Sequence, residues 1–245
     1  MAEERLKHRE NGLTVAIPTM NSWRGFLRGQ LPVYLDHPAI SYVIICDETG
    51  NDIIDMYEER IIDHPKLRVY QNDIILGAYE NKRQCMLKAP TKWVAVLDSS
   101  NLFDPEFFNA FINCIMRKGE PKKTVYCAGL AERFLPLTAS TEVRTEHFNG
   151  MKVSYDNWNT ILEIREWDIL LNSGNIIWPT KVVRHFPEIS KEISDGIDNM
   201  FFIQAAIRAG YTMSIEPTMH YVHTVLDDTY TSDLDVKDWI IRYGC

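Results

Sequence analysis

Asp98 is the residue whose position points most directly to chemistry. It follows the apolar run 93–97 (WVAVL), which has the character of a buried strand. A carboxylate that emerges from a buried strand needs a cation or hydrogen-bond donors, because an unpaired buried charge is costly. A divalent ion that bridges a diphosphate takes one or two carboxylates together with phosphate oxygens and water. Asp98 is therefore a candidate ligand for such an ion, and capping of the following turn is the alternative.

A second acidic side chain, Asp47, directly follows another strand-like run at 42–46. A carboxylate at this position can accept hydrogen bonds from a base or from ribose hydroxyls, as acidic residues do in nucleotide-binding folds. It can equally form a turn and cap the helix predicted from residue 52. The sequence leaves both roles open.

The elements that must position these residues alternate between strand and helix. Strand-like runs lie at 13–17, 42–46, 67–70 and 93–97, and helical patterns lie between them and after them, at 52–63, 78–89 and 105–117. This alternation predicts a parallel sheet covered by helices. Ligands bind such sheets at the carboxyl ends of the strands. The polar clusters 18–21, 47–49 and 98–101 are therefore predicted to converge on one edge.

The third helix of this half carries two cations, Lys82 and Arg83, a few residues after Gly77. From there either side chain can reach a diphosphate, and a solvated helix face is the alternative. Asn81 beside them is a candidate contact for the base.

From residue 124 the regular alternation of strand-like and helical segments ends. Short, partly antiparallel strands are predicted at 124–129, 143–147, 151–155 and 162–165. A helix at 198–209, a strand at 212–215 and a closing helix at 235–243 follow. We expect one domain over 1–245, with a nucleotide-binding half at about 12–118 and an acceptor-binding, catalytic half at about 119–245.

Two carboxylates near the helix 198–209 are candidates for a general base. Asp198 lies at the start of the helix and Asp195 one turn earlier. The helix dipole favours acids there, so capping alone would also account for them. A base must face the acceptor hydroxyl in a partly desolvated cleft. His223 is a candidate imidazole ligand for a metal, although a single His near the end of a strand is more often an ordinary polar residue.

Composition narrows the class of protein. The 245 residues carry a formal net charge of -8, which argues against a nucleic-acid partner, because phosphate contacts need clustered Lys and Arg. The five Cys form no C-x-x-C pair, which indicates free thiols and a reducing compartment. We find neither a signal peptide nor a run near the about 18 apolar residues of a membrane span. A soluble, cytoplasmic protein is expected, and its oligomeric state is left open.

Taken in order, these segments resemble the GT-A glycosyltransferases, in particular the large inverting group called family 2. The resemblance runs from about Thr14 to His223. The segments that carry it are VAIPTMN at 15–21, IICDETGND at 44–52, GAYENKR at 77–83, VLDSSN at 96–101, NSGN at 172–175, and the pair Asp198-Asn199 ahead of AGY at 209–211.

The resemblance implies an α/β fold of the GT-A (Rossmann-like) type. Its mostly parallel central sheet is flanked by helices, and a smaller mixed or antiparallel region lies on the acceptor side. It implies transfer of a sugar from a nucleoside-diphosphate sugar, UDP- more than GDP-, to a glycan or other hydroxyl acceptor. The donor-binding residues it implies are Pro18, Thr19, Asn21, Asp47, Glu48, Asn81, Lys82, Arg83, Asp98, Ser99, Ser100 and Asn175. For a Mn²⁺ or Mg²⁺ ion it implies Asp98, Ser100 and His223, and for the catalytic base Asp198, with Asp195 as the competitor.

The chain departs from the family pattern at two places. Only Asp98 is acidic in the metal motif, where Ser100 and Asn101 replace acids, and Asn199 replaces an acid of the catalytic pair. If Asp198 instead contacts the donor sugar, the enzyme would be a retaining one, and a non-catalytic sugar-nucleotide-binding relic is the other alternative. A nucleotidyltransferase or a dehydrogenase would need a Gly-rich loop after the first strand, and 19–29 is not Gly-rich.

Overall fold

The structure is a computed structural model. It describes residues 12–99, 101–103, 105–118, 123–135, 140–143, 148–159, 173–189 and 198–224, and at Asp198 and His223 it describes the backbone only. The strand predicted at 162–165 and the helix predicted at 235–243 lie outside these ranges. None of the helices in these ranges combines the length and the apolar character needed to cross a bilayer.

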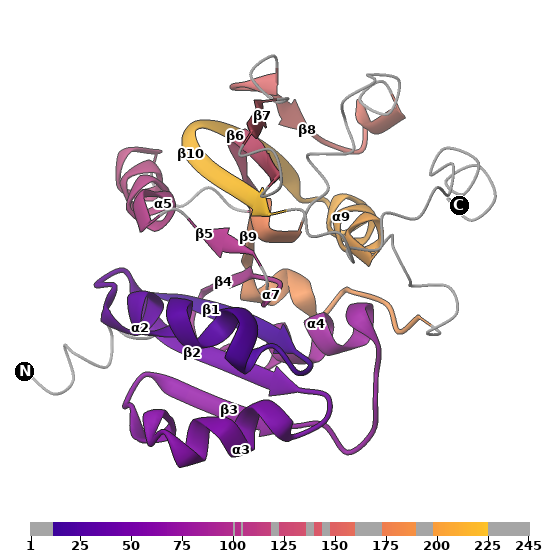
Figure 1. Ribbon diagram of the computed structural model, residues 1–245. Helices are drawn as coiled ribbons and strands as arrows, with labels where there is room; N and C mark the ends of the chain where they lie inside the picture. The colour runs from indigo at the N-terminus through magenta and orange to yellow at the C-terminus, as the bar shows by residue number, and fades with distance from the viewer. Residues whose placement is uncertain are drawn as a thin grey trace, which may run out of the picture.

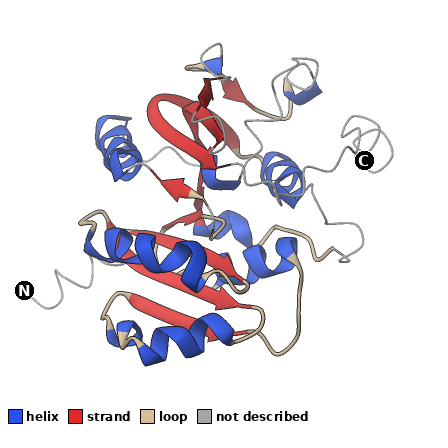
Figure 2. Cartoon of the chain, in the orientation of Figure 1, coloured by secondary structure: helices blue, strands red, loops and turns tan. Residues whose placement is uncertain are grey.

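One mixed sheet of ten strands runs through the described parts of both halves (Figures 1 and 2). Its main path is β3-β2-β1-β4-β9-β6-β10-β5, with β7 paired to β6 and β8 to β10. The strands are β1 (Leu13–Thr19), β2 (Ile40–Asp47), β3 (Leu67–Gln71), β4 (Trp93–Val96), β5 (Leu102–Phe103), β6 (Thr124–Leu135), β7 (Ser140–Val143), β8 (Lys152–Val153), β9 (Ile176–Pro179) and β10 (Thr212–Thr224).

The first four strands, β1 to β4, are parallel to one another, which confirms the prediction from the alternating pattern. β2 pairs with β1 and β3, and β1 pairs with β4, each time in parallel register. β9 then enters antiparallel to both β4 and β6. β6 and β10 are parallel to each other along most of their length. The change of direction at β9 separates the parallel first half from the mixed second half.

Helices cover both faces of the sheet. The described helices are η1 (Trp23–Leu27), α2 (Arg28–Asp36), α3 (Asn51–Glu58), η2 (Ile61–Asp63), α4 (Ala78–Leu87), α5 (Pro105–Lys118), η5 (Ser173–Asn175), α7 (Thr180–Val183) and α9 (Asp198–Arg208). α2, α3 and α5 contribute to one apolar core, and α4, α7 and α9 to the other. In the upper part of Figure 1, α5 lies to the left of the sheet and α9 to the right.

Among the predicted boundaries that were wrong, two in the first half have a local cause. β1 continues through Pro18 to Thr19, beyond the predicted end at residue 17. Proline has no N–H to donate, but the pairing of β1 with β4 ends at Ala16, so no hydrogen bond to β4 is lost at Pro18. The helix expected over 52–63 ends at Glu58. Arg60 then has a φ of 58°, a left-handed conformation that breaks the helix before the short turn η2.

Gly129 offers a direct test of the packing between β6 and β10. A Cβ at this position would lie 2.6 Å from the backbone oxygen of Glu216, which cannot move without distorting β10. We expect Gly129→Ala to lower the melting temperature by about 5 °C or more, the usual effect of overpacking in a domain of this size. The matched control is Gly29→Ala on α2, where no atom lies within 4 Å and a helical Ala is favoured. Equal melting temperatures for the two variants would contradict this packing.

Candidate functional site

The register of the sheet brings the predicted polar clusters to one edge. Thr19 pairs with Asp47 at the carboxyl ends of β1 and β2. Ala16 pairs with Val96, and Asp98 lies two residues beyond Val96, at the level of Pro18. Since Ala95 pairs with Ile177 of the antiparallel β9, Asn175 enters this edge from the other direction. The convergence predicted from the sequence therefore holds for these strand ends.

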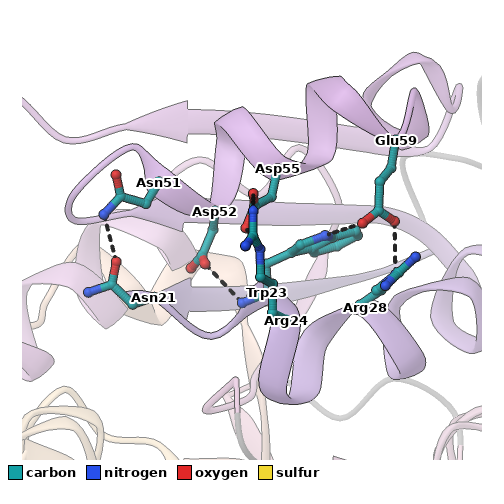
Figure 3. Close-up of polar contacts among 8 residues, drawn as sticks. All are labelled: Asn21, Trp23, Arg24, Arg28, Asn51, Asp52, Asp55 and Glu59. Atoms are coloured by element: carbon teal, nitrogen blue, oxygen red, sulfur yellow. Dashed lines mark hydrogen bonds and ion pairs between the residues drawn. The ribbon is translucent and has the colours of Figure 1, made fainter.

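Asp52 fixes the loop that follows β1 (Figure 3). This buried carboxylate accepts hydrogen bonds from the Thr19 hydroxyl at 2.5 Å and from the backbone N–H groups of Ser22 at 3.1 Å and Trp23 at 2.8 Å. Figure 3 shows the last of these contacts. The Trp23 indole N–H donates to Glu59 at 3.1 Å. The loop between β1 and η1 is thus tied to α3 by side chains about thirty residues away in sequence.

The tip of the same loop is held by amide side chains. Asn21 has a φ of 57°, a left-handed conformation that Asn tolerates better than most residues. Its side-chain oxygen accepts hydrogen bonds from Asn51 Nδ2 at 2.8 Å and from Thr49 Oγ1 at 3.3 Å. Asn21 is exposed, so the predicted donor contact can be made from the surface of this loop.

Asp47 has the contacts of a helix cap. Its carboxylate is fully buried and accepts hydrogen bonds from the backbone N–H groups of Thr49 at 3.0 Å and Ile53 at 3.1 Å. Of the two roles that the sequence left open, these contacts are those of the turn that leads into α3. Its predicted contact with a donor stays a prediction.

Glu48 and Asn81 connect β2 to the start of α4. The Glu48 carboxylate accepts hydrogen bonds from the N–H groups of Leu76 at 2.7 Å and Gly77 at 3.0 Å. Asn81 Nδ2 donates to the Cys46 carbonyl at 3.2 Å, and this side chain is buried. Both side chains therefore hold the backbone at this edge of the sheet in place. Their predicted contacts with the donor stay predictions.

The two cationic side chains of α4 contact different parts of the fold. Lys82 Nζ lies 2.8 Å from Asp98 Oδ1, and only 8% of its side chain is exposed. Arg83 points toward the segment after α7, where its Nε donates to the Phe186 carbonyl at 3.1 Å and its Nη1 lies 2.8 Å from Glu80. The alternative of a solvated helix face is wrong for Lys82, and the position of Arg83 does not favour its predicted role at the diphosphate.

The segment after β4 is joined to the loop after β1 and to the second half. Ser99 Oγ lies 2.8 Å from Ser22 Oγ and donates to it. The side-chain oxygen of Asn101 is buried without a hydrogen-bond partner among the described residues. Burial raises the pKa of the Tyr221 phenol well above its ordinary value, and the negative charge of Asp98 raises it further, which places Tyr221 near this site as a neutral group.

Gly174 allows the close approach of Tyr221. A Cβ at Gly174 would overlap the Tyr221 ring, so this position has no room for a side chain. Asn175 beside it is fully buried, and its predicted donor contact stays a prediction. The packing of this loop against β10 therefore explains why the segment 172–175 has a glycine at position 174.

Several predicted residues cannot be placed with their side chains. Asp195 and Ser100 lie outside the described residues, and the side chains of Asp198 and His223 are not described. The backbone of Asp198 begins α9, as predicted. Within the described ranges, no three His, Cys, Asp or Glu side chains gather into a metal-binding group.

Among the three Trp considered for sugar stacking, Trp178 belongs to the core. It is fully buried, and its ring packs edge-on against Phe186 and Phe202. Trp158 is half-buried against the same core, and Trp167 lies outside the described residues.

Sequence reasoning missed Asp52 and Tyr221 as parts of this site. Asp52 lies in the segment 44–52, but its partners are thirty residues upstream, and no local pattern reveals them. Tyr221 lies beyond the strand predicted at 212–215, because β10 continues to Thr224.

No protein-family profile matches this chain, and no curated protein does. Among solved structures, S. aureus TarS 1-349 in complex with UDP aligns with a TM-score of 0.64 and 17% identity, over 87% of this chain and 60% of that one. The same protein in complex with UDP-GlcNAc aligns with a TM-score of 0.65 and 17% identity, over 88% and 59%. The chain thus spans about three fifths of the length of TarS 1-349. At this identity the likeness shows the fold alone, and that fold is of the GT-A-like glycosyltransferase type.

Proposed function

We propose that this protein is a glycosyltransferase of the family 2 type, which transfers a sugar from a UDP-sugar to a hydroxyl group of a glycan or other acceptor. In the inverting form, a bond forms between the acceptor oxygen and the anomeric carbon while the bond from that carbon to the diphosphate breaks. The bonding electrons leave with the diphosphate, and the acceptor proton passes to the carboxylate of Asp198.

The observation that carries this proposal is the convergence of Thr19, Asp47 and Asp98 on the carboxyl edge of a parallel sheet, with the cation Lys82 beside them. Ligands bind parallel sheets at this edge, and a diphosphate needs positive charge there. The similarity to TarS, solved with UDP and with UDP-GlcNAc, supports UDP over GDP as the nucleotide.

The donor site can be tested through Asp98. We expect calorimetry to detect UDP binding to the wild type, and Asp98→Ala to weaken it at least tenfold, because the variant removes the partner that holds Lys82 at this edge. The matched control is Asp63→Ala, an exposed acid that precedes β3 at the opposite edge of the sheet. An equal loss in both variants, or a loss in neither, would remove the donor site from this edge.

A non-catalytic relic of the same fold is the second candidate, and the single acid of the metal motif favours it. An enzyme would turn over a UDP-sugar, whereas a non-catalytic relic would only bind it. Release of free UDP from a UDP-sugar panel by the wild type, lost in Asp198→Asn, supports the enzyme. Binding of UDP without any release of UDP over hours, with a range of hydroxyl acceptors present, supports the relic.

A further inference from the structure

The contact between Lys82 and Asp98 bears on how charge at this site is neutralised. Lys82 Nζ lies 2.8 Å from Asp98 Oδ1. The Lys82 side chain is 8% exposed, whereas that of Asp98 is 33% exposed. The ammonium therefore belongs to a largely buried side chain, and its carboxylate partner is the more exposed of the two.

The described residues do not fit a divalent ion at Asp98. One of its two carboxylate oxygens already bonds to the Lys82 ammonium. A doubly charged ion on the same carboxylate would lie within a few ångströms of the buried ammonium and would be repelled by it. Moving Lys82 aside would leave a desolvated charge without its partner, which is strongly unfavourable.

Among the described side chains, the other acids at this edge already accept hydrogen bonds from protein groups. Ser99 donates its hydroxyl proton to Ser22. The Asp47 carboxylate accepts hydrogen bonds from backbone N–H groups of the turn that leads into α3, and that of Glu48 accepts those at the start of α4. Asp52 is likewise bonded to three donors of the β1 loop. Among the described side chains at this edge, Lys82 is the one that carries a positive charge, with Asp98 as its ion-pair partner.

We infer that Lys82 takes the place of the divalent ion: its ammonium, oriented by Asp98, is the cation that binds the diphosphate of the donor. This inference rests on the proposed function, because it assumes a nucleoside-diphosphate ligand. Asp98 is then a positioning residue, which holds the ammonium at the edge where the diphosphate binds. Lys is well suited to this role, since its ammonium is a compact charge with three donors.

The test measures the affinity for UDP and for uridine by calorimetry, with Mn²⁺ and with EDTA. We expect the wild type to bind UDP with the same Kd, within about twofold, in both conditions. Lys82→Met should weaken UDP binding at least tenfold, the usual size of one lost charge-assisted hydrogen bond, while uridine affinity stays the same. Lys82→Arg should recover most of the loss, because it restores the charge. Lys88→Met, at the end of the same helix, should bind UDP as the wild type does.

The outcomes separate the two proposals. If EDTA lowers the UDP affinity of the wild type tenfold or more, a metal ion neutralises the diphosphate, and the inference fails while the proposed function stands. If Lys82→Met keeps the wild-type affinity, or loses uridine binding as well, Lys82 does not act on the diphosphate. If the wild type binds neither UDP nor uridine in either condition, the proposed function fails, and this inference with it. Thermal melts of Lys82→Met and Lys82→Arg without ligand identify any loss that comes from unfolding.

Discussion

Asp198→Asn should lower the rate of sugar transfer by about 10²–10⁴-fold and leave the affinity for UDP within a few-fold of wild type. A general base contributes a factor of this size. It acts on the acceptor proton in the transition state and not on the bound donor, so the loss falls on kcat and not on donor binding. Asp198 begins α9, where the helix dipole stabilises a carboxylate. Initial rates with a UDP-sugar, together with UDP calorimetry on the same preparation, measure both effects.

Asp195→Asn is the control for this assignment, since that residue lies one turn earlier in sequence. If Asp195→Asn abolishes transfer and Asp198→Asn does not, the alignment of the catalytic helix is wrong by one turn. If neither variant affects transfer while donor hydrolysis continues, the protein has no base at this position. A retaining mechanism would then be the better interpretation.

The parallel half of the fold could be predicted because its signals are local. β1, β2 and β4 are largely apolar runs followed by polar residues, and β3 is a short run with alternating apolar residues. The start of α4 is marked by Gly77, whose φ of 85° suits few other residues. The end of α9 is marked in the same way by Gly210, with a φ of 79°. Patterns of this kind depend on near neighbours only, so a single sequence contains them.

The helix that begins at Trp23 was not predicted, because its local signals oppose it. Gly25, Gly29 and Pro32 are poor helix formers, and Pro32 lies inside α2. Packing overrides these propensities, since the side chains that η1 and α2 turn inward are buried against the sheet: Trp23, Leu27, Leu31, Tyr34 and Leu35. Their spacing of three and four residues was the available signal. β9, with four residues, carries no comparable pattern.

The sequence could predict that the site lies at the carboxyl edge of the parallel strands, but it could not predict which side chains contact one another there. The sequence places Lys82 and Arg83 next to each other, but successive residues on a helix point about 100° apart. In the fold this turns Lys82 toward Asp98 and Arg83 toward Phe186. Which neighbour each cation meets depends on how α4 packs on the sheet, and this is tertiary information.

Asp52→Ala should destabilise the protein by about 3–5 kcal/mol, which lowers the melting temperature of a domain of this size by about 6 °C or more. The variant leaves the N–H groups of Ser22 and Trp23 and the hydroxyl of Thr19 without their shared acceptor. Because Thr19 ends β1 at the proposed donor edge, UDP affinity should fall as well.

Asp55→Ala is the matched control, one turn along the same helix. Asp55 bonds only to Arg24 among the contacts in Figure 3, and the Arg24 side chain is 79% exposed. The Asp55 side chain is 18% exposed, but an ion pair with one partner in solvent contributes only about 1 kcal/mol, so this variant should lose far less stability than Asp52→Ala. Differential scanning calorimetry of both variants measures the difference. Equal melting temperatures would mean that Asp52 does not hold the β1 loop. A large loss of stability with unchanged UDP affinity would mean that the loop is held there but does not form part of the donor site.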